Sequence, residues 1–137
     1  MKTKITVETI VNTAPENAWF HFVNPASIEK WNHASEDWHC PKAINDLTEG
    51  GSFSYTMSAT DGSISFDFNG IFLRVIPNEY LKYKIADGRI VEVQFIAVGE
   101  NTKVIETFEA ENMHSEEMQR AGWQSILDNY KKFVDEN

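Results

Sequence analysis

The sequence predicts an α+β domain in which a curved antiparallel sheet of seven strands wraps around one long C-terminal helix. Three observations support this fold class. Apolar and polar residues alternate in several segments between residues 38 and 108, Asp-Gly pairs stand at 61–62 and 87–88, and residues 115–135 carry a helical stripe of apolar side chains. Tight Asp-Gly turns join antiparallel strands. An antiparallel sheet that buries one face against helices is an α+β layer arrangement.

The first strand and two short helices are expected in the first quarter of the chain. Residues 3–12 alternate with period 2, which is typical of a strand. Pro15 suits the first position of a helix, and Asn24 followed by Pro25 suits the start of a second helix. Together these helices should turn the following apolar side chains inward: Trp19, Phe22, Val23, Ile28 and Trp31.

Six further segments have strand character. The first, residues 38–48, is irregular, whereas the other five alternate clearly. Gly70 lies inside one of them and indicates a bulge or a close approach of two backbones. The residues expected to face inward are Ile64, Phe72, Leu81, Ile85, Val91, Val93, Ala97 and Val104, together with strand residues of the candidate cavity named below.

One long helix is expected at the C-terminus. Ser115 is a suitable N-cap, and Glu116 and Glu117 lie at the positive end of the helix dipole. A strongly twisted seven-stranded sheet tends to curl, and a sheet curled around one helix leaves a gap. We expect a ligand cavity in that gap.

Composition narrows the class of protein. The 137 residues fit one domain, residues 1–137, with no repeat or linker. The net charge of −9 and the absence of a basic cluster argue against nucleic acid and anionic membranes as partners. The N-terminal segment lacks the apolar core of a signal peptide, and a single cysteine suits a reducing compartment. We therefore expect a soluble cytoplasmic protein.

Four segments, taken in order, resemble a known family. They are "VNTAPENAWFHFVNPASIEKWN", "DLTEGGSFSYTM", "DFNGIFLRVIPNEYLKYKI" and "EEMQRAGWQSILDNYKKFV", and together they span nearly the whole chain. The set resembles the SRPBCC or START-like superfamily, which has the helix-grip fold. Within it, the chain is most similar to single-domain bacterial relatives of the activator of the heat-shock chaperone ATPase, which border polyketide-cyclase-like proteins. The resemblance implies a cavity between sheet and C-terminal helix, but not its occupant.

The candidate cavity residues are mostly large apolar side chains of the strands and the last helix. For most of them plain core packing is the alternative, and for Trp38 it is an equal one. Gly122 in the helix either lets the sheet approach or opens room for a ligand. The full set is Trp38, Phe53, Tyr55, Met57, Phe66, Phe68, Tyr83, Phe95, Glu106, Phe108, Gln119, Gly122, Trp123 and Ile126.

Two polar residues interrupt the apolar faces. Glu106 lies between Val104 and Phe108 on one strand face, and Gln119 lies in the helix stripe. A buried carboxylate is costly unless it is paired or protonated. The functional interpretation is that both side chains orient a polar group of a ligand. The alternative for Glu106 is a place at a sheet edge or an ion pair with Arg74, Arg89 or Arg120.

The sequence contains no catalytic or metal-binding signature. His39 and Cys40 are adjacent in an extended segment and would point to opposite faces, which makes them a poor pair of metal ligands. Cys40 also lacks a local feature that lowers the pKa of a thiol, such as a helix N-terminus. No nucleophile–base motif occurs, and we expect no cofactor. Catalysis by one acid or base, Glu106 or His39, stays open.

Three functions follow from these observations and from the resemblance. Binding of a small hydrophobic or amphipathic molecule, such as a lipid, comes first. The alternatives are a chaperone-ATPase activator that uses an exposed surface and a polyketide-cyclase-like enzyme. The family's eukaryotic activators carry a further domain that this sequence lacks, which weakens the chaperone hypothesis. A homodimer through a sheet edge or the short helices is also compatible with the sequence.

Overall fold

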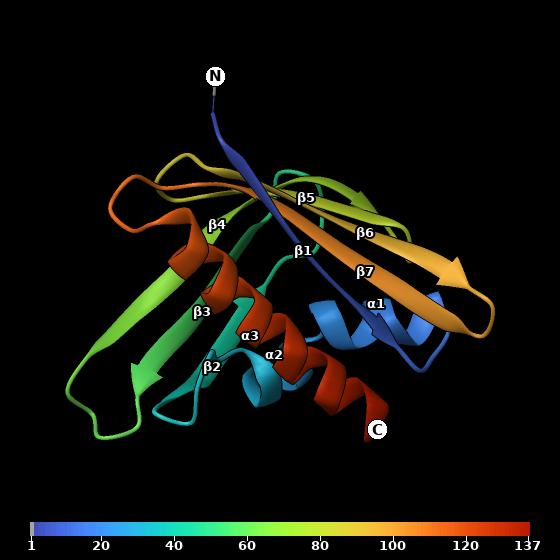
Figure 1. The fold of residues 1–137 in the computed structure, drawn as a ribbon, viewed down its shortest axis with the longest axis horizontal. Coiled ribbons are helices and arrows are strands. Elements are labelled where there is room, and N and C mark those ends of the chain that lie inside the picture. The colour runs from blue at the N-terminus through green and yellow to red at the C-terminus, as the bar shows by residue number, and fades with distance from the viewer. Residues whose placement is uncertain (1) are drawn as a thin grey trace.

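The structure is a computed structural model that describes residues 2–137 and confirms the predicted architecture. Seven strands form one antiparallel sheet in the order β1-β7-β6-β5-β4-β3-β2. Figure 1 shows the sheet curled around the space that the three helices occupy. The elements are β1 (Lys4–Val11), α1 (Pro15–Val23), α2 (Pro25–Trp31), β2 (Trp38–Asn45), β3 (Ser52–Ala59), β4 (Ser65–Ile76), β5 (Tyr80–Ile85), β6 (Ile90–Val98), β7 (Asn101–Glu109) and α3 (Glu116–Asp135).

The turns and caps form where the local sequence predicts them. Gly62 and Gly88 adopt positive φ angles of 78° and 94° in the two hairpin turns. Residues with a side chain rarely adopt such angles, so glycine is the favoured residue at both positions. The Ser115 hydroxyl accepts a hydrogen bond from the Met118 amide and caps α3. A Cβ atom at Gly70 would lie 2.2 Å from the Lys84 carbonyl oxygen, so β4 and β5 approach closely there as expected.

Side chains of the helices cover backbone groups at both edges of the sheet. On the β1 edge, Gln124 Nε2 donates to the Glu8 carbonyl at 3.1 Å and Lys131 Nζ donates to the Ile10 carbonyl at 2.7 Å. On the β2 edge, the Ala43 amide donates to Glu29 Oε2 of α2 at 3.0 Å. These contacts occupy groups that another strand would need to extend the sheet.

A packed aromatic cluster fills one end of the space between the sheet and the helices. Phe22 lies at its centre, with ring centroids 5.2–5.4 Å from those of Trp31, Tyr130 and Phe95. Trp19 packs edge-on against Phe95 at 5.3 Å. The Tyr130 hydroxyl donates to the Ala18 carbonyl at 2.6 Å and ties α3 to α1. This end is therefore solid core, and any ligand space must lie toward β3–β5.

Two details of the strands differ from the sequence expectation. Ile64 lies in the turn before β4 and is 58% exposed, because β4 begins one residue later. Ala97, near the end of β6, is also exposed instead of inward-facing. The irregularity expected around residue 40 appears as a shift in the β2–β3 register between His39 and Lys42.

Candidate functional site

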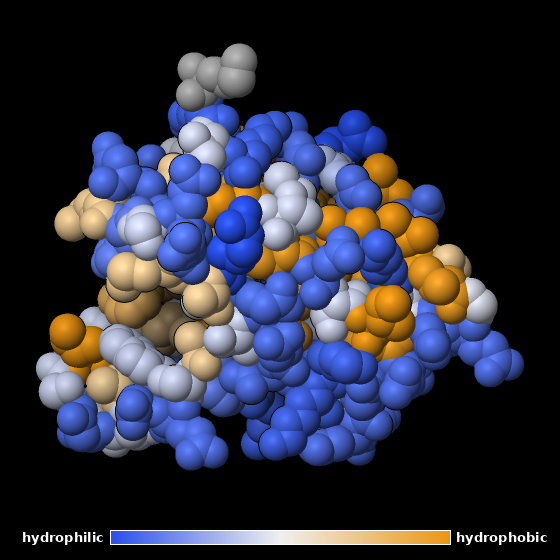
Figure 2. Space-filling model, in the orientation of Figure 1, coloured by the Kyte–Doolittle hydropathy of each residue, from blue (hydrophilic) through white to orange (hydrophobic). Residues whose placement is uncertain are grey.

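A cavity of about 240 Å³ lies between the sheet and α3, beside the aromatic cluster. Every helix and the strands β3, β4, β5 and β7 contribute to its wall. Figure 2 shows a hollow with apolar side chains between the first turns of α3 and the β3–β4 hairpin. The lining consists of Phe22, Val23, Trp31, Asn32, Phe53, Tyr55, Met57, Phe66, Phe68, Phe72, Leu81, Tyr83, Arg89, Glu106, Trp123 and Ile126.

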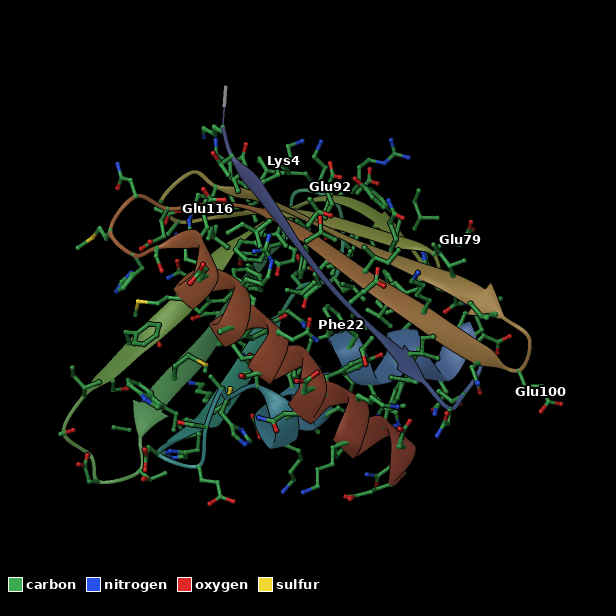
Figure 3. The ribbon with its side chains drawn as sticks, viewed as in Figure 1. Lys4, Phe22, Glu79, Glu92, Glu100 and Glu116 are labelled. Atoms are coloured by element: carbon green, nitrogen blue, oxygen red, sulfur yellow. The ribbon has the colours of Figure 1, made fainter. Side chains whose placement is uncertain are left out.

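Aromatic rings make up most of the cavity wall. Phe53 lies 5.0–5.2 Å, centroid to centroid, from Tyr55, Phe72 and Tyr83. Phe68, whose ring centroid lies 5.9 Å from that of Phe53, packs edge-on against Trp123 of α3 at 6.3 Å. Figure 3 shows Phe22 pointing into the interior, whereas the labelled residues Glu79, Glu92 and Glu100 lie at the periphery. The cavity is therefore an apolar space inside an acidic molecule.

Glu106 is the acidic residue of this lining. It lies on β7, in the middle of the sheet, opposite Val7 on β1 and Val93 on β6. Its residue exposure is only 6%. Among the described residues, no hydrogen bond or ion pair reaches its carboxyl group. Burial raises the pKa of Glu106 from 4.5 to about 8, so the side chain is mainly a neutral acid at pH 7.

The alternatives for Glu106 are wrong. β7 lies between β1 and β6, so Glu106 is not at a sheet edge. Arg74 pairs with Glu49 at 3.5 Å, and Arg89 pairs with Asp87 at 2.8 Å. Arg120 is exposed on α3. Glu106 therefore faces the cavity without a partner from residues 2–137.

Two tyrosines bring further hydroxyl groups to the same cavity. Tyr83 is buried, and its hydroxyl forms no hydrogen bond within the described part of the chain. Burial raises its pKa well above 10, and the nearby carboxyl group of Glu106 raises it further. The Tyr55 hydroxyl accepts from Asn45 Nδ2 at 3.2 Å, and burial raises the pKa of Tyr55 to about 12. Both tyrosines stay protonated at neutral pH.

Nine of the fourteen candidate residues line the cavity: Phe53, Tyr55, Met57, Phe66, Phe68, Tyr83, Glu106, Trp123 and Ile126. The alternating pattern placed the strand residues of this group on the inward face. Phe66 is still 53% exposed, because it lies near the outer end of the β3–β4 hairpin, at the mouth of the cavity.

The other five candidates lie outside the lining. Phe95 packs into the aromatic cluster, and Trp38 packs edge-on against Phe66 at 5.9 Å. Phe108 lies behind Trp123, with the two rings stacked at 4.0 Å. At Gly122, an added Cβ would meet no atom within 4 Å, so no close approach of the sheet requires the glycine, and Gly122 is not among the residues that line the cavity.

Gln119 does not line the cavity, and its side-chain amide forms hydrogen bonds with the loop before α3 instead. Its Oε1 accepts from the Glu111 amide at 2.9 Å, and its Nε2 donates to the carbonyls of Glu111 and His114 at 3.0 and 2.9 Å. These bonds tie the loop before α3 to the helix. The sequence showed that Gln119 interrupts the apolar stripe, but it could not show that a nearby loop satisfies the amide.

The structure adds lining residues that the candidate set omitted. Phe22, Val23 and Trp31 come from the short helices, whose apolar stripe was interpreted only as core, and Asn32 directly follows α2. Phe72 and Leu81 were predicted to face inward but were not assigned to the cavity. Arg89 follows an Asp-Gly turn and was considered only as an ion-pair partner of Glu106, not as a lining residue.

The Cys40 region does not form a reactive site. Cys40 is buried, and its thiol lies 3.6 Å from the Lys42 carbonyl oxygen. Burial raises the pKa of the Cys40 thiol, which disfavours the nucleophilic thiolate. Within residues 2–137, no three His, Cys, Asp or Glu side chains are grouped as metal ligands would be. None of the helices described is long and apolar enough to span a membrane.

The fold and the cavity place the protein in the helix-grip class. Comparison with known families identifies the family within this class. Residues 12–135 match the family described as "Activator of Hsp90 ATPase homolog 1-like protein", and the chain belongs to this family. A search of curated proteins finds no match.

Solved structures of similar proteins agree with this assignment. The solution structure of an AHSA1-like protein from Aeromonas hydrophila is 43% identical, covers 98% of this chain and 93% of its own, and superposes with a TM-score of 0.93. A protein from Cytophaga hutchinsonii is 45% identical over the same shares of the two chains, with a TM-score of 0.84. A crystal structure from Nitrosomonas europaea shares the fold at 16% identity, covering 97% and 94%, with a TM-score of 0.85.

Proposed function

We propose that this protein binds a small hydrophobic or amphipathic molecule in the cavity between the sheet and α3. The observation that carries the proposal is the unpartnered acid Glu106 in an otherwise aromatic and aliphatic cavity. Apolar pockets with a few convergent polar groups are typical ligand sites. The carboxyl group of Glu106 borders the cavity, so a polar group of a bound ligand can pair with it there.

Native mass spectrometry of gently purified protein tests this function. A stoichiometric small-molecule adduct, identified after solvent extraction, would support a binding protein and name the ligand class. The matched variants Ile126→Phe and Ile96→Phe locate the adduct, because Ile126 lines the cavity whereas Ile96 is 43% exposed on the other face of β6. We expect Ile126→Phe to lose the adduct and Ile96→Phe to keep it. An adduct that survives Ile126→Phe as well as Ile96→Phe would contradict a site in this cavity.

The family description supports a second candidate, stimulation of an Hsp90-type ATPase through an exposed surface. Ile10 and Ile96 flank Lys103 across three neighbouring strands, and both are more than 40% exposed. Figure 2 shows an apolar area on this side of the molecule, away from the hollow. An ATPase assay with a bacterial Hsp90 tests the candidate. Stimulation lost in Ile96→Asp and kept in Ile126→Phe would favour it, and no stimulation by the wild type would exclude it for that chaperone.

A further inference from the structure

Tyr83 and Glu106 lie on the same concave face of the sheet, on β5 and β7. In the cross-strand register, Leu81, Val93 and Glu106 form one row, and Tyr83, Val91 and Phe108 form the adjacent row. In these two rows, the intervening strand β6 contributes the small side chains of Val91 and Val93, both completely buried. Both side chains line the same cavity, and the carboxyl group of Glu106 adds to the rise in the pKa of Tyr83 that burial causes.

Both groups are hydrogen-bond donors without an acceptor among residues 2–137. At neutral pH each carries its proton, because burial disfavours both the carboxylate and the phenolate. A neutral carboxylic acid held in an apolar site donates a strong hydrogen bond to a carbonyl or enolate oxygen. The O–H groups of Glu106 and Tyr83 find no such oxygen within residues 2–137.

The surrounding titratable and charged groups do not supply the acceptor. Tyr130 of α3 donates its hydroxyl proton to the Ala18 carbonyl. Tyr55 of β3 accepts a hydrogen bond from Asn45. Arg89, before β6, is a donor and is held by Asp87 at 2.8 Å. None of these three side chains therefore accepts a hydrogen bond from Glu106 or Tyr83.

The size of the cavity limits the rest of the ligand. A volume of about 240 Å³ lies just below the range of roughly 300–1,000 Å³ that is typical of pockets for drug-sized ligands. A long acyl chain or a four-ring skeleton would not be enclosed. The aromatic side chains, among them Phe53, Phe68 and Trp123, offer flat surfaces on which one or two rings can pack.

We propose that Glu106 and Tyr83 are paired donors to one acceptor oxygen, so that the cavity selects compact one- or two-ring ligands with a ketone, enone or enolate oxygen. This inference rests on the proposed function and names the ligand class for that site. It also states what the site rejects. A hydrocarbon leaves the two donors unpaired, and a primary ammonium group brings only further donors.

Three matched naphthalene probes test the inference by isothermal titration calorimetry at about pH 6.5, where Glu106 is neutral. They are 2-acetylnaphthalene, which has an acceptor oxygen, 2-ethylnaphthalene, which does not, and 2-(aminomethyl)naphthalene, which is a cation. We expect the ketone to bind at least about tenfold more tightly than the other two, because only the ketone pairs the buried donors.

Variants separate the donor role from simple packing. Glu106→Gln keeps a neutral donor in the same place and should retain most of the ketone preference, whereas Glu106→Leu and Tyr83→Phe should reduce it. In the wild type the ketone affinity should fall as the pH rises through about 8, and in Glu106→Gln it should not. Circular dichroism of each variant verifies the fold, and Glu106→Gln provides a test even if Glu106→Leu fails to fold.

Each contrary result has a distinct meaning. Equal binding of all three probes would leave the cavity as a ligand site and overturn the paired donors. Tightest binding of the amine, lost in Glu106→Gln, would overturn them in favour of an ionised carboxylate. No binding of any probe would overturn the compact-ring class. If native mass spectrometry then also finds no adduct, the proposed function fails with it.

Discussion

Glu106→Gln should stabilise the protein at neutral pH but not in acid. Gln has nearly the shape of a protonated Glu and cannot ionise. In the folded chain, burial raises the pKa of Glu106 from 4.5 to about 8. Between these two values the unfolded chain has lost the proton while the folded chain has kept it. Wild-type stability therefore declines as the pH rises through this window.

The pKa shift sets the size of the effect. Where the folded and unfolded states differ by one bound proton, the free energy of unfolding changes by about 1.4 kcal/mol per pH unit. Starting from pH 4.5, the loss reaches about 3 kcal/mol at pH 7 and approaches about 5 kcal/mol above pH 8. These values are upper limits, because water entering the cavity would lower the desolvation cost. The difference in the free energy of unfolding between Glu106→Gln and the wild type should therefore grow by up to about 3 kcal/mol, in favour of the variant, from pH 4.5 to pH 7.

Urea unfolding of the wild type and the variant between about pH 4 and pH 8 measures this difference. Subtracting the two curves removes the contributions of the histidines and other carboxyl groups that both proteins share. Glu92→Gln is the control, because Glu92 lies on the other face of β6, away from the cavity, and its carboxylate is 3.9 Å from Lys82 Nζ. A Glu106→Gln curve parallel to that of the wild type across the whole range would refute a buried, unpartnered acid.

Three further substitutions test the frame around the cavity by urea unfolding. Tyr130→Phe should cost about 1 kcal/mol, because it removes the hydrogen bond to the Ala18 carbonyl. Gly70→Ala should cost about 2–3 kcal/mol, because its Cβ would overlap the Lys84 carbonyl. Gln119→Leu should cost about 2–3 kcal/mol through three lost hydrogen bonds and leave ligand affinity unchanged. If one of these variants unfolds at the same urea concentration as the wild type, the contact assigned to that residue does not stabilise the fold.

The architecture was predictable because its signals are local. Alternation with period 2 assigns each strand residue to one face, and the Asp-Gly pairs fix the hairpins that contain Gly62 and Gly88. These signals placed Phe53, Tyr83 and Glu106 on the concave face before any contact was known. Alternation fails where the register shifts, as it does between His39 and Lys42.

The extent of the cavity was not predictable, because it depends on how much of the concave face the helices fill. Phe95 and Tyr83 both stand at inward-facing positions of alternating segments, on the neighbouring strands β6 and β5. Trp19 and Phe22 nevertheless cover Phe95, whereas Tyr83 lines the cavity. That difference is set by the positions of α1 and α2 relative to the sheet. Gln119 failed as a candidate for the same reason, since its partners lie in a loop whose course the helical stripe does not encode.

Glu106 connects the stability of the fold with the chemistry of the cavity. Without a ligand, its burial makes the protein less stable at pH 7 than it would be with a neutral side chain of the same shape. The same neutral O–H group, next to that of Tyr83, is what an acceptor oxygen of a ligand would pair with. A leucine at this position would remove the desolvation cost and also the selectivity. Stability and ligand selectivity should therefore change in opposite directions when Glu106 is replaced by an apolar residue.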